Sequence, residues 1–281
     1  MTDKHLELFS GTHSIGKSCE SLDIEVVSLD RDLPDFDKWD ISSTYKSRNH
    51  IQEDIMTWDY KIFPNDYFNS ISMSPVCLWS SQLRKCWINS YYNPDTNKFS
   101  RTEKEGYVLF TEELLQKDID KYMKPMVDKC FEIMEYFMEG NPDLKWWLEN
   151  PKSSSMKDYI RDKYPQYNYN TVVDYCSYGF PYRKSTRFWN NFGFKGLKCK
   201  GKECDQMEKK GDKLRHKEDL FTSTFLNIDG KIIRVDTKKK REQYKEELKN
   251  KPKVKHIKIN KLYRYRIPEQ LIKDMLNKIY N

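Results

Sequence analysis

Short apolar runs alternate with polar, helix-like segments along the first two thirds of the chain. The run HLELF at 5–9 breaks into small polar residues, and later runs also end at Gly, Pro, Asp or Asn. This alternation is typical of a mostly parallel β-sheet with helices on both faces. We therefore predict an α/β fold with strands at 5–9, 23–30, 50 to about Asp54, 69–74, 145–150, 170–178 and 185–191.

Helical periodicity marks further segments. Residues 14–22 read as a helix directly after the first strand. Between Thr111 and Glu139 apolar residues recur at every third or fourth position, which predicts a long amphipathic helix. Pro125 should kink or split that helix, because proline has no N–H to donate. Near the end, 266–280 reads as a closing helix with Pro268 near its start.

The pattern changes after Asn191. The stretch from 192 is rich in Gly and Lys with little apolar periodicity, so we predict loops or a small lobe there, with a short exposed helix at 240–251 at most. No internal repeat is present. We predict three parts, namely an α/β domain at 1–191, a small basic lobe at 192–262, and a C-terminal helix at 263–281 that packs back on the α/β domain.

Positive charge is concentrated in the C-terminal part. The net charge is +7, and residues 195–281 hold 26 Lys/Arg against 13 Asp/Glu, whereas residues 1–194 hold 24 against 30. Such asymmetry favours a polyanionic partner, nucleic acid above all, over a merely solvated lysine-rich surface.

Composition narrows the class of protein further. A chain of 281 residues with 37% hydrophobic and 33% charged residues can bury a real core. Its apolar runs fall well short of the roughly 18–20 residues of a membrane span, and its N-terminus does not resemble a signal peptide. Seven cysteines, an odd number, fit reduced thiols. We expect an intracellular monomer without a membrane partner.

Glycines and acidic residues at successive strand ends predict a nucleotide-type pocket. FSGTHSIG places Gly11 and Gly16 between a strand and a helix, where backbone N–H groups can approach a ligand closely. Taken alone, FSGTHSIG is explained equally well as a turn that has only a structural role and binds no ligand. Asp30, at the end of the next strand, is placed to bind ribose hydroxyls, and Asp54 could bind an adenine amino group one strand later.

A thiol and a third carboxylate also follow predicted strands. Cys77 lies in SMSPVCLWSS just after a predicted strand, and Glu149 ends the apolar run KWWLEN. The carboxyl ends of parallel strands meet at one edge of a sheet, where ligands bind. We therefore predict one active site that combines the glycine turn, the thiol and the carboxylate.

The ordered series of motifs resembles the cytosine-5 DNA methyltransferase family, and most of all its compact phage and large-DNA-virus members. The series is LELFSGTHSIGK, VVSLD, EDIMTWDY, SPVCLWSS, WWLENP and DYCSYGFPYRKSTRFWNN, which covers about 5–191. The resemblance implies a Rossmann-like catalytic domain, S-adenosyl-L-methionine as methyl donor, double-stranded DNA as substrate and base flipping. It also implies a location in a virus-infected host cell, cytoplasm or nucleus, or in a bacterial cytoplasm.

The resemblance also assigns roles. Cys77 matches the nucleophile that adds to carbon 6 of cytosine, and we expect its surroundings to lower its pKa. Glu149 matches the carboxyl group that contacts ring nitrogen 3 and the exocyclic amine. Arg183, Lys184 and Arg187 are candidates for the role of the family's Gln-x-Arg-x-Arg motif. Of these we expect Arg183 and Arg187 to be catalytic and Lys184 to contact nucleic acid. Donor binding falls to Phe9, Ser10, Gly11, Thr12, Ser14, Ile15, Gly16, Asp30, Asp54, Ile55, Ser74 and Pro75.

The chain departs from the family pattern at two places. Val76 stands where the family has a second proline, and the Gln-x-Arg-x-Arg motif is not cleanly present in YGFPYRKSTR. Alternatives therefore stay open: the same reaction on RNA, or a decayed relative that only binds nucleic acid. Methylation of an exocyclic amine is disfavoured, because SPVC lacks the aromatic residue of that motif.

Two further groups of residues carry weaker signals. Cys199, Cys204 and His216 lack a fourth ligand and good spacing for zinc, so we predict a loop with incidental thiols and no metal. The segment 82–106 mixes aromatic and basic residues that could stack on bases and hold phosphates. We expect it to be a loop that closes over DNA through Arg84, Lys85 and Arg101.

Overall fold

The computed structural model describes residues 2–32, 49–210, 213–218 and 265–280, and the backbone of the short pieces 225–228, 231–234 and 242–243. Most of the predicted helix at 240–251 therefore lies outside the described residues. No helix in the described part of the chain is both long and apolar enough to cross a membrane.

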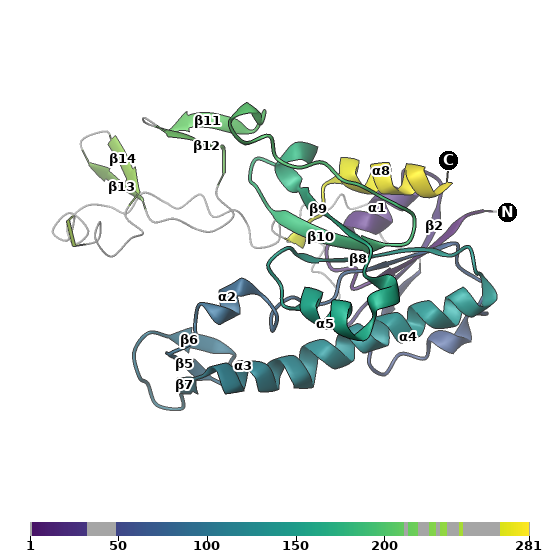
Figure 1. The fold of residues 1–281 in the computed structure, drawn as a ribbon, viewed down its shortest axis with the longest axis horizontal. Coiled ribbons are helices and arrows are strands. Elements are labelled where there is room, and N and C mark those ends of the chain that lie inside the picture. Colours follow the sequence, from purple (N-terminus) through teal and green to yellow (C-terminus); the bar gives the residue numbers. More distant parts are fainter. Residues whose placement is uncertain are drawn as a thin grey trace.

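A mostly parallel sheet forms the centre of the molecule (Figure 1). Its strand order is β3-β2-β1-β4-β8-β10-β9, and all neighbours pair in parallel except at β10, which runs antiparallel to both β8 and β9. The strands are β1 (Lys4–Leu8), β2 (Glu25–Asp30), β3 (His50–Gln52), β4 (Ser70–Met73), β8 (Lys145–Pro151), β9 (Asn170–Asp174) and β10 (Ser185–Asn190).

Helices cover both faces of this sheet (Figure 1). On one face lie α1 (Ser14–Glu20) and α8 (Glu269–Tyr280), and on the other lie α4 (Lys124–Gly140) and α5 (Met156–Lys163). The strand order changes direction between β1 and β4, which makes this the switch point of a doubly wound sheet. The Rossmann-like α/β fold predicted from the sequence is confirmed.

Each face of the sheet has its own hydrophobic core. On the α4 side, Phe131 and Phe137 pack with Trp146 and other fully buried side chains. On the other side, Ile15 of α1 packs with a stripe of α8 that includes Ile272. Full burial of such a side chain contributes roughly 1.5–3 kcal/mol, so α8 is held firmly on the central sheet.

The long helix predicted for 111–139 is split, as its proline indicates. Helix α3 (Glu112–Asp118) begins at Thr111, whose hydroxyl accepts the N–H of Leu114 at 3.2 Å. A π-helical turn (Ile119–Met123) then leads into α4, which has Pro125 in its first turn. Proline is tolerated there because its missing N–H would find no helical partner at that position.

Several elements differ from the sequence-based expectation. The third strand is short, and residues 175–178 form a 3₁₀ turn after β9 instead of extending that strand. Helix α5 was not predicted. The segment 82–106 contributes to a folded subregion with α2 (Gln82–Lys85) and a sheet in the order β6-β5-β7, formed by β6 (Lys98–Ser100), β5 (Ser90–Asn93) and β7 (Val108–Phe110).

The C-terminal part begins with short hairpins. They pair β11 (Met207–Lys210) with β12 (Lys213–His216), and β13 (Phe225–Ile228) with β14 (Lys231–Arg234). Further 3₁₀ turns lie at Tyr60–Ile62, Pro165–Tyr167 and Gly201–Glu203.

Candidate active site

The predicted site residues follow strands that end at the same edge of the sheet. In the register of the sheet, Leu8 of β1 lies between Leu29 of β2 and Met73 of β4, and Met73 in turn pairs with Leu148 of β8. The residues that follow these positions therefore share the carboxyl edge, where doubly wound sheets bind ligands.

A tight turn follows β1. Phe9, Gly11 and His13 all have left-handed φ values, of 61°, 46° and 51°. The N–H of Gly11 donates to Oδ2 of Asp30 at 2.8 Å, and the N–H of Ser10 donates to the carbonyl of Leu29 at 3.0 Å. These bonds fasten the turn to the end of β2, so the glycine turn and the acidic residue predicted to share a pocket do lie together.

Two buried hydroxyls at the switch point fit a polar ligand. Ser10 follows β1 and Ser74 follows β4, and the Oγ of each is buried with no hydrogen-bond partner among the described residues. Buried polar atoms are nearly always paired, so an unpaired pair at a ligand-binding edge points to a missing partner. Asp30 adds carboxylate oxygens that can accept more bonds than those from Gly11 and Asp32. This donor and acceptor set fits a nucleoside-type cofactor.

The other residues predicted to bind the donor have mixed surroundings. Thr12 and Ser14 share a hydroxyl hydrogen bond of 2.8 Å, and Ser14 also accepts the N–H of Ile267 at 3.4 Å. Ile15 and Gly16 are buried in α1, with Ile15 in the core against α8. Asp54 and Ile55 lie in a turn after β3, and the side chain of Ile55 packs in the main hydrophobic core. Pro75 is buried in the loop after β4.

The loop that carries Cys77 is fastened from β8. Asn150, which is fully buried, donates from Nδ2 to the carbonyl of Pro75 at 2.9 Å. Beyond the thiol, Ser80 bonds back to the carbonyl of Cys77 through its N–H at 3.2 Å, and its own hydroxyl meets that of Ser154 at 2.7 Å. Both flanks of Cys77 are thereby tied to the end of β8 and the turn after it.

Glu149 lies on β8 beside a tyrosine and a lysine. Tyr175 donates from its hydroxyl to Oε1 of Glu149 at 3.2 Å, and Nζ of Lys184 lies 3.8 Å from the same oxygen. That ammonium also sits 4.8 Å from the centre of the Tyr175 ring. Sequence reasoning missed Tyr175, although its place in DYCSY, directly after a predicted strand, is a signal that could have indicated it.

Burial and charge set the state of the Cys77 thiol. Its removal from water raises its pKa, the negative charge of Glu149 raises it further, and Lys184 acts in the opposite direction. The expectation of a lowered pKa was therefore wrong for the chain without substrate. The same interactions show that Cys77, Glu149 and Lys184 lie close enough to influence one another.

The two candidate arginines bind other partners. Arg183 forms an ion pair with Asp174, at 3.0 Å from Nε to Oδ1, and Arg187 donates to Oδ1 of Asn170. Of the three cations in YRKSTR, Lys184 is the one that contacts Glu149. The structure thus brings Lys184 to the carboxylate of Glu149, whereas both arginines bind residues of β9.

The expected DNA-contacting loop also needs correction. Arg84 is only 2% exposed and pairs with Asp118, with Asn97 at 3.0 Å from Nη1. Such a buried guanidinium cannot reach a phosphate in this conformation, and it stabilises the β5–β7 subregion instead. Arg101 is exposed but stacks on Trp87 and donates to Ser90 at 2.8 Å. Lys85 is half-buried in α2.

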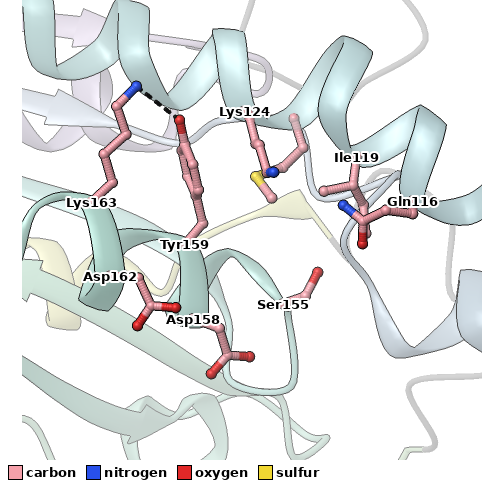
Figure 2. A pocket seen from close by; sticks show the side chains of 9 residues that line it. Gln116, Ile119, Lys124, Ser155, Asp158, Tyr159, Asp162 and Lys163 are labelled. Carbon is pink, nitrogen blue, oxygen red and sulfur yellow. Dashed lines mark hydrogen bonds between the residues drawn. The ribbon is translucent and has the colours of Figure 1, made fainter.

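A groove of about 670 Å³ lies apart from these residues, between α5 and the α3–α4 helices (Figure 2). Asp158 and Asp162 line one side, and Lys163 donates to the hydroxyl of Tyr159 at 3.0 Å. None of the residues predicted for catalysis or donor binding lines it.

Comparisons with known proteins bear on the family resemblance. No protein-family model matches the sequence. The chain is 29% identical over 221 residues to "Probable DNA (cytosine-5)-methyltransferase" of frog virus 3 (isolate Goorha), an alignment that covers 77% of this chain and 85% of the relative.

Three solved structures show a distant likeness. They are S. pombe Dnmt2 methyltransferase (TM-score 0.39, 15% identity, 75% of this chain and 57% of that one), Spodoptera frugiperda DNMT2 (0.44, 13%, 100% of both) and Entamoeba histolytica methyltransferase EhMeth (0.41, 14%, 69% and 55%). The fold assignment rests on the strand order of this chain. The viral relative spans most of both sequences, and the resemblance to cytosine-5 DNA methyltransferases predicted from the ordered motifs is therefore confirmed.

Proposed function

We propose that this chain transfers a methyl group from S-adenosylmethionine to carbon 5 of cytosine in DNA, through a covalent adduct with Cys77. The observation that carries the proposal is the position of the Cys77 loop, which Asn150 fastens beside Glu149 at the carboxyl edge of the sheet. A reactive thiol and a proton-donating carboxyl group are what covalent attack on a pyrimidine ring requires.

The chemistry assigns a proton to each group. As the bond from Sγ of Cys77 to carbon 6 forms, the thiol proton passes to the carboxylate of Glu149, and electron density moves through carbon 5 toward ring nitrogen 3. Glu149, in the position to contact ring nitrogen 3, supplies the proton that this nitrogen gains. After carbon 5 has taken the methyl group, its own proton leaves to solvent water, and the electrons of that bond re-form the carbon 5–carbon 6 double bond and expel the thiolate. Ring nitrogen 3 then returns its proton through Glu149 to the thiolate.

Lys184 and Tyr175 position Glu149. Both contact Oε1, so the other carboxylate oxygen stays available to a base in the site. The ammonium of Lys184 also lowers the energy of a thiolate on Cys77, because it stabilises negative charge there. Lys184 therefore takes the place in this chain that the family resemblance assigns to an arginine.

S-adenosylmethionine supplies an activated methyl group when it is bound. The unpaired hydroxyls of Ser10 and Ser74 and the carboxylate of Asp30 are the groups of this chain that would hold it. Both serines lie next to the switch point between β1 and β4, and Ser74 precedes the Cys77 loop. The donor would thus sit between the glycine turn and the thiol.

DNA is favoured as the substrate because the viral relative is named as a DNA methyltransferase. The strongly basic C-terminal part supports a nucleic acid of either kind. A test supplies the full chain with labelled donor and either duplex DNA or transfer RNA. Label on carbon 5 of cytosine in DNA supports the proposal. Label on RNA alone would assign the same chemistry to RNA.

A matched pair of cysteine variants controls that experiment. Cys77→Ala should abolish transfer, whereas Cys86→Ala removes an exposed thiol in the same region and should leave transfer intact. Donor binding without transfer to either nucleic acid would identify a decayed relative and overturn the proposal.

A further inference from the structure

Three cysteines and a histidine converge beside the last strand of the central sheet. The ligand atoms of Cys176, Cys199, Cys204 and His216 all lie within 4.8 Å of one another. Cys176 and Cys204 are buried, and the other two are half-buried. The sequence offered only the last three as candidates; the fold adds Cys176 from the 3₁₀ turn after β9.

The spacing fits a tetrahedral zinc ion. Zinc–sulfur bonds of about 2.3 Å and zinc–nitrogen bonds of about 2.0–2.1 Å place two sulfurs about 3.8 Å apart, and a sulfur and a nitrogen about 3.6 Å apart. The Sγ of Cys199 lies 3.6 Å from Nε2 of His216. The remaining separations stay within 4.8 Å, so small side-chain movements complete the tetrahedron.

The backbone holds these ligands in place from both sides. Cys199 donates its N–H to Oδ2 of Asp174 at 2.9 Å, which fastens it to the end of β9. The carbonyl of Cys204 accepts the N–H of Met207 at 2.9 Å, and Met207 pairs with His216 across the β11–β12 hairpin. The cluster therefore joins the catalytic sheet to the first hairpin of the basic part.

A disulfide explains the cluster less well. All the cysteines that the structure describes are free thiols. One disulfide would use two sulfurs and leave a third sulfur and an imidazole beside them without a role. Three sulfurs and one nitrogen at tetrahedral spacing form a closed set typical of structural zinc sites.

We propose that Cys176, Cys199, Cys204 and His216 bind one structural zinc ion that fastens the basic C-terminal part to the catalytic sheet. Four protein ligands leave no open position for water or substrate, so the ion has no chemical step to perform. The proposal does not depend on the methyltransferase function.

The site has a consequence for the active site. Cys176 directly follows Tyr175, which contacts Glu149, and Asp174 binds both Arg183 and the N–H of Cys199. Loss of zinc would therefore free the turn that positions Tyr175 as well as the hairpin.

The test measures metal in the full chain purified under reducing conditions. We expect about one zinc per chain by elemental analysis, retained during dialysis against a mild chelator. Cys204→Ser should bind much less than half an equivalent, because a three-ligand site is weaker. Cys86→Ser removes a thiol outside the cluster and should keep the full equivalent.

A second pair separates ligation from folding. His216→Cys keeps four ligands and should retain zinc, whereas His216→Ala should lose it. Cobalt(II) added to metal-free protein should give the visible absorption of a tetrahedral thiolate site, and zinc should displace it.

Several results would overturn the proposal. They are zinc-free protein that takes up neither metal on reconstitution, iron in place of zinc, a disulfide within the cluster under reducing conditions, or equal zinc in the wild type and both His216 variants. If Cys204→Ser does not fold, the two His216 variants and limited proteolysis of the wild type before and after chelation still test whether the cluster binds zinc. Zinc should then protect the segment 195–218 from cleavage, and no protection would contradict the proposal.

Discussion

Asn150 of β8 donates a hydrogen bond from Nδ2 to the carbonyl of Pro75, two residues before the candidate nucleophile Cys77. This bond joins the end of β8 to the loop after the neighbouring strand β4, and the side chain of Asn150 is fully buried. It gives the Cys77 loop an anchor that does not depend on a second proline at Val76.

Removal of that anchor should impair turnover more than donor binding. Asn150→Ala leaves the Pro75 carbonyl without its partner, which costs about 1–3 kcal/mol of stability for a buried group. Misplacement of the thiol by even about 1 Å can lower kcat by as much as about 100-fold. Steady-state kinetics should show lower kcat with a nearly unchanged KM for the donor.

Val76→Ala is the matched control for this variant. Val76 is 43% exposed, so its truncation removes little packing. We expect kcat within about twofold of wild type, since surface substitutions usually change stability by less than about 0.5 kcal/mol. A large loss in Val76→Ala with none in Asn150→Ala would show that the proline position, and not the asparagine, aims the thiol.

The reactivity of Cys77 should rise with pH in the chain without substrate. Burial and Glu149 raise the pKa of this thiol, so the folded chain keeps its proton at pH values where an unfolded chain loses it. That difference also makes this group's contribution to stability fall as the pH rises above the unfolded pKa.

Two variants should move the thiol pKa in opposite directions. Glu149→Gln removes a negative charge and should lower it, and Lys184→Gln removes a positive charge and should raise it. Mass spectrometry of the alkylated Cys77 peptide against pH measures both. A downward shift in Lys184→Gln would be inconsistent with the charges assigned here.

His5 should make the fold sensitive to acid. It is fully buried in β1, its ring nitrogens lie 2.5 Å from Ser70 Oγ and 2.8 Å from Ser72 Oγ, and burial lowers its pKa to about 3. An unfolded His binds a proton below about pH 6.5, so stability falls from there toward the folded pKa.

Urea unfolding at several pH values measures this loss of stability. One proton changes the free energy of unfolding by about 1.4 kcal/mol per pH unit. His5→Gln should be less stable at pH 7 but should show a slope smaller by nearly that amount between pH 6 and pH 4. Equal slopes in both proteins would mean that His5 is not held neutral.

Arg84 should prove important for the stability of the fold and not for DNA binding. Its side chain is almost fully buried against Asp118, so Arg84→Ala leaves a partly buried carboxylate without its partner and should cost about 3–5 kcal/mol. Lys85→Ala, at the next position of α2, is the control and should cost much less. Thermal unfolding with DNA binding at low salt separates the two roles; weaker DNA binding with unchanged stability would contradict the structural role.

The sequence predicted the central sheet well because its strands are short apolar runs that end in turn-forming residues. It missed β5, β6 and β7 because SYYN, KFS and VLF are too short to show a pattern, and their stability comes from contacts with Arg84 and its neighbours. Arg84 itself was misjudged since the sequence does not reveal that Asp118 lies beside it.

The candidate site, like the fold, was predicted from the sequence only in part. Residues at strand ends were brought to one edge, as the parallel sheet requires. The choice of Lys184 as the cation at Glu149 depends on how the chain enters β10, where Tyr175 donates its N–H to the carbonyl of Lys184 at 3.1 Å. Cys176 joins Cys199, Cys204 and His216 for a similar reason, because only the folded chain brings that turn and hairpin together.

The covalent role of Cys77 is tested most directly by trapping on duplex DNA that contains 5-fluorocytosine, in the presence of S-adenosylmethionine. Fluorine at carbon 5 cannot leave as a proton does, so an adduct through carbon 6 persists. We expect a denaturation-resistant complex whose DNA-linked peptide contains Cys77, present in Cys86→Ala and absent in Cys77→Ala. Donor binding with no adduct, or an adduct at another cysteine, would contradict it.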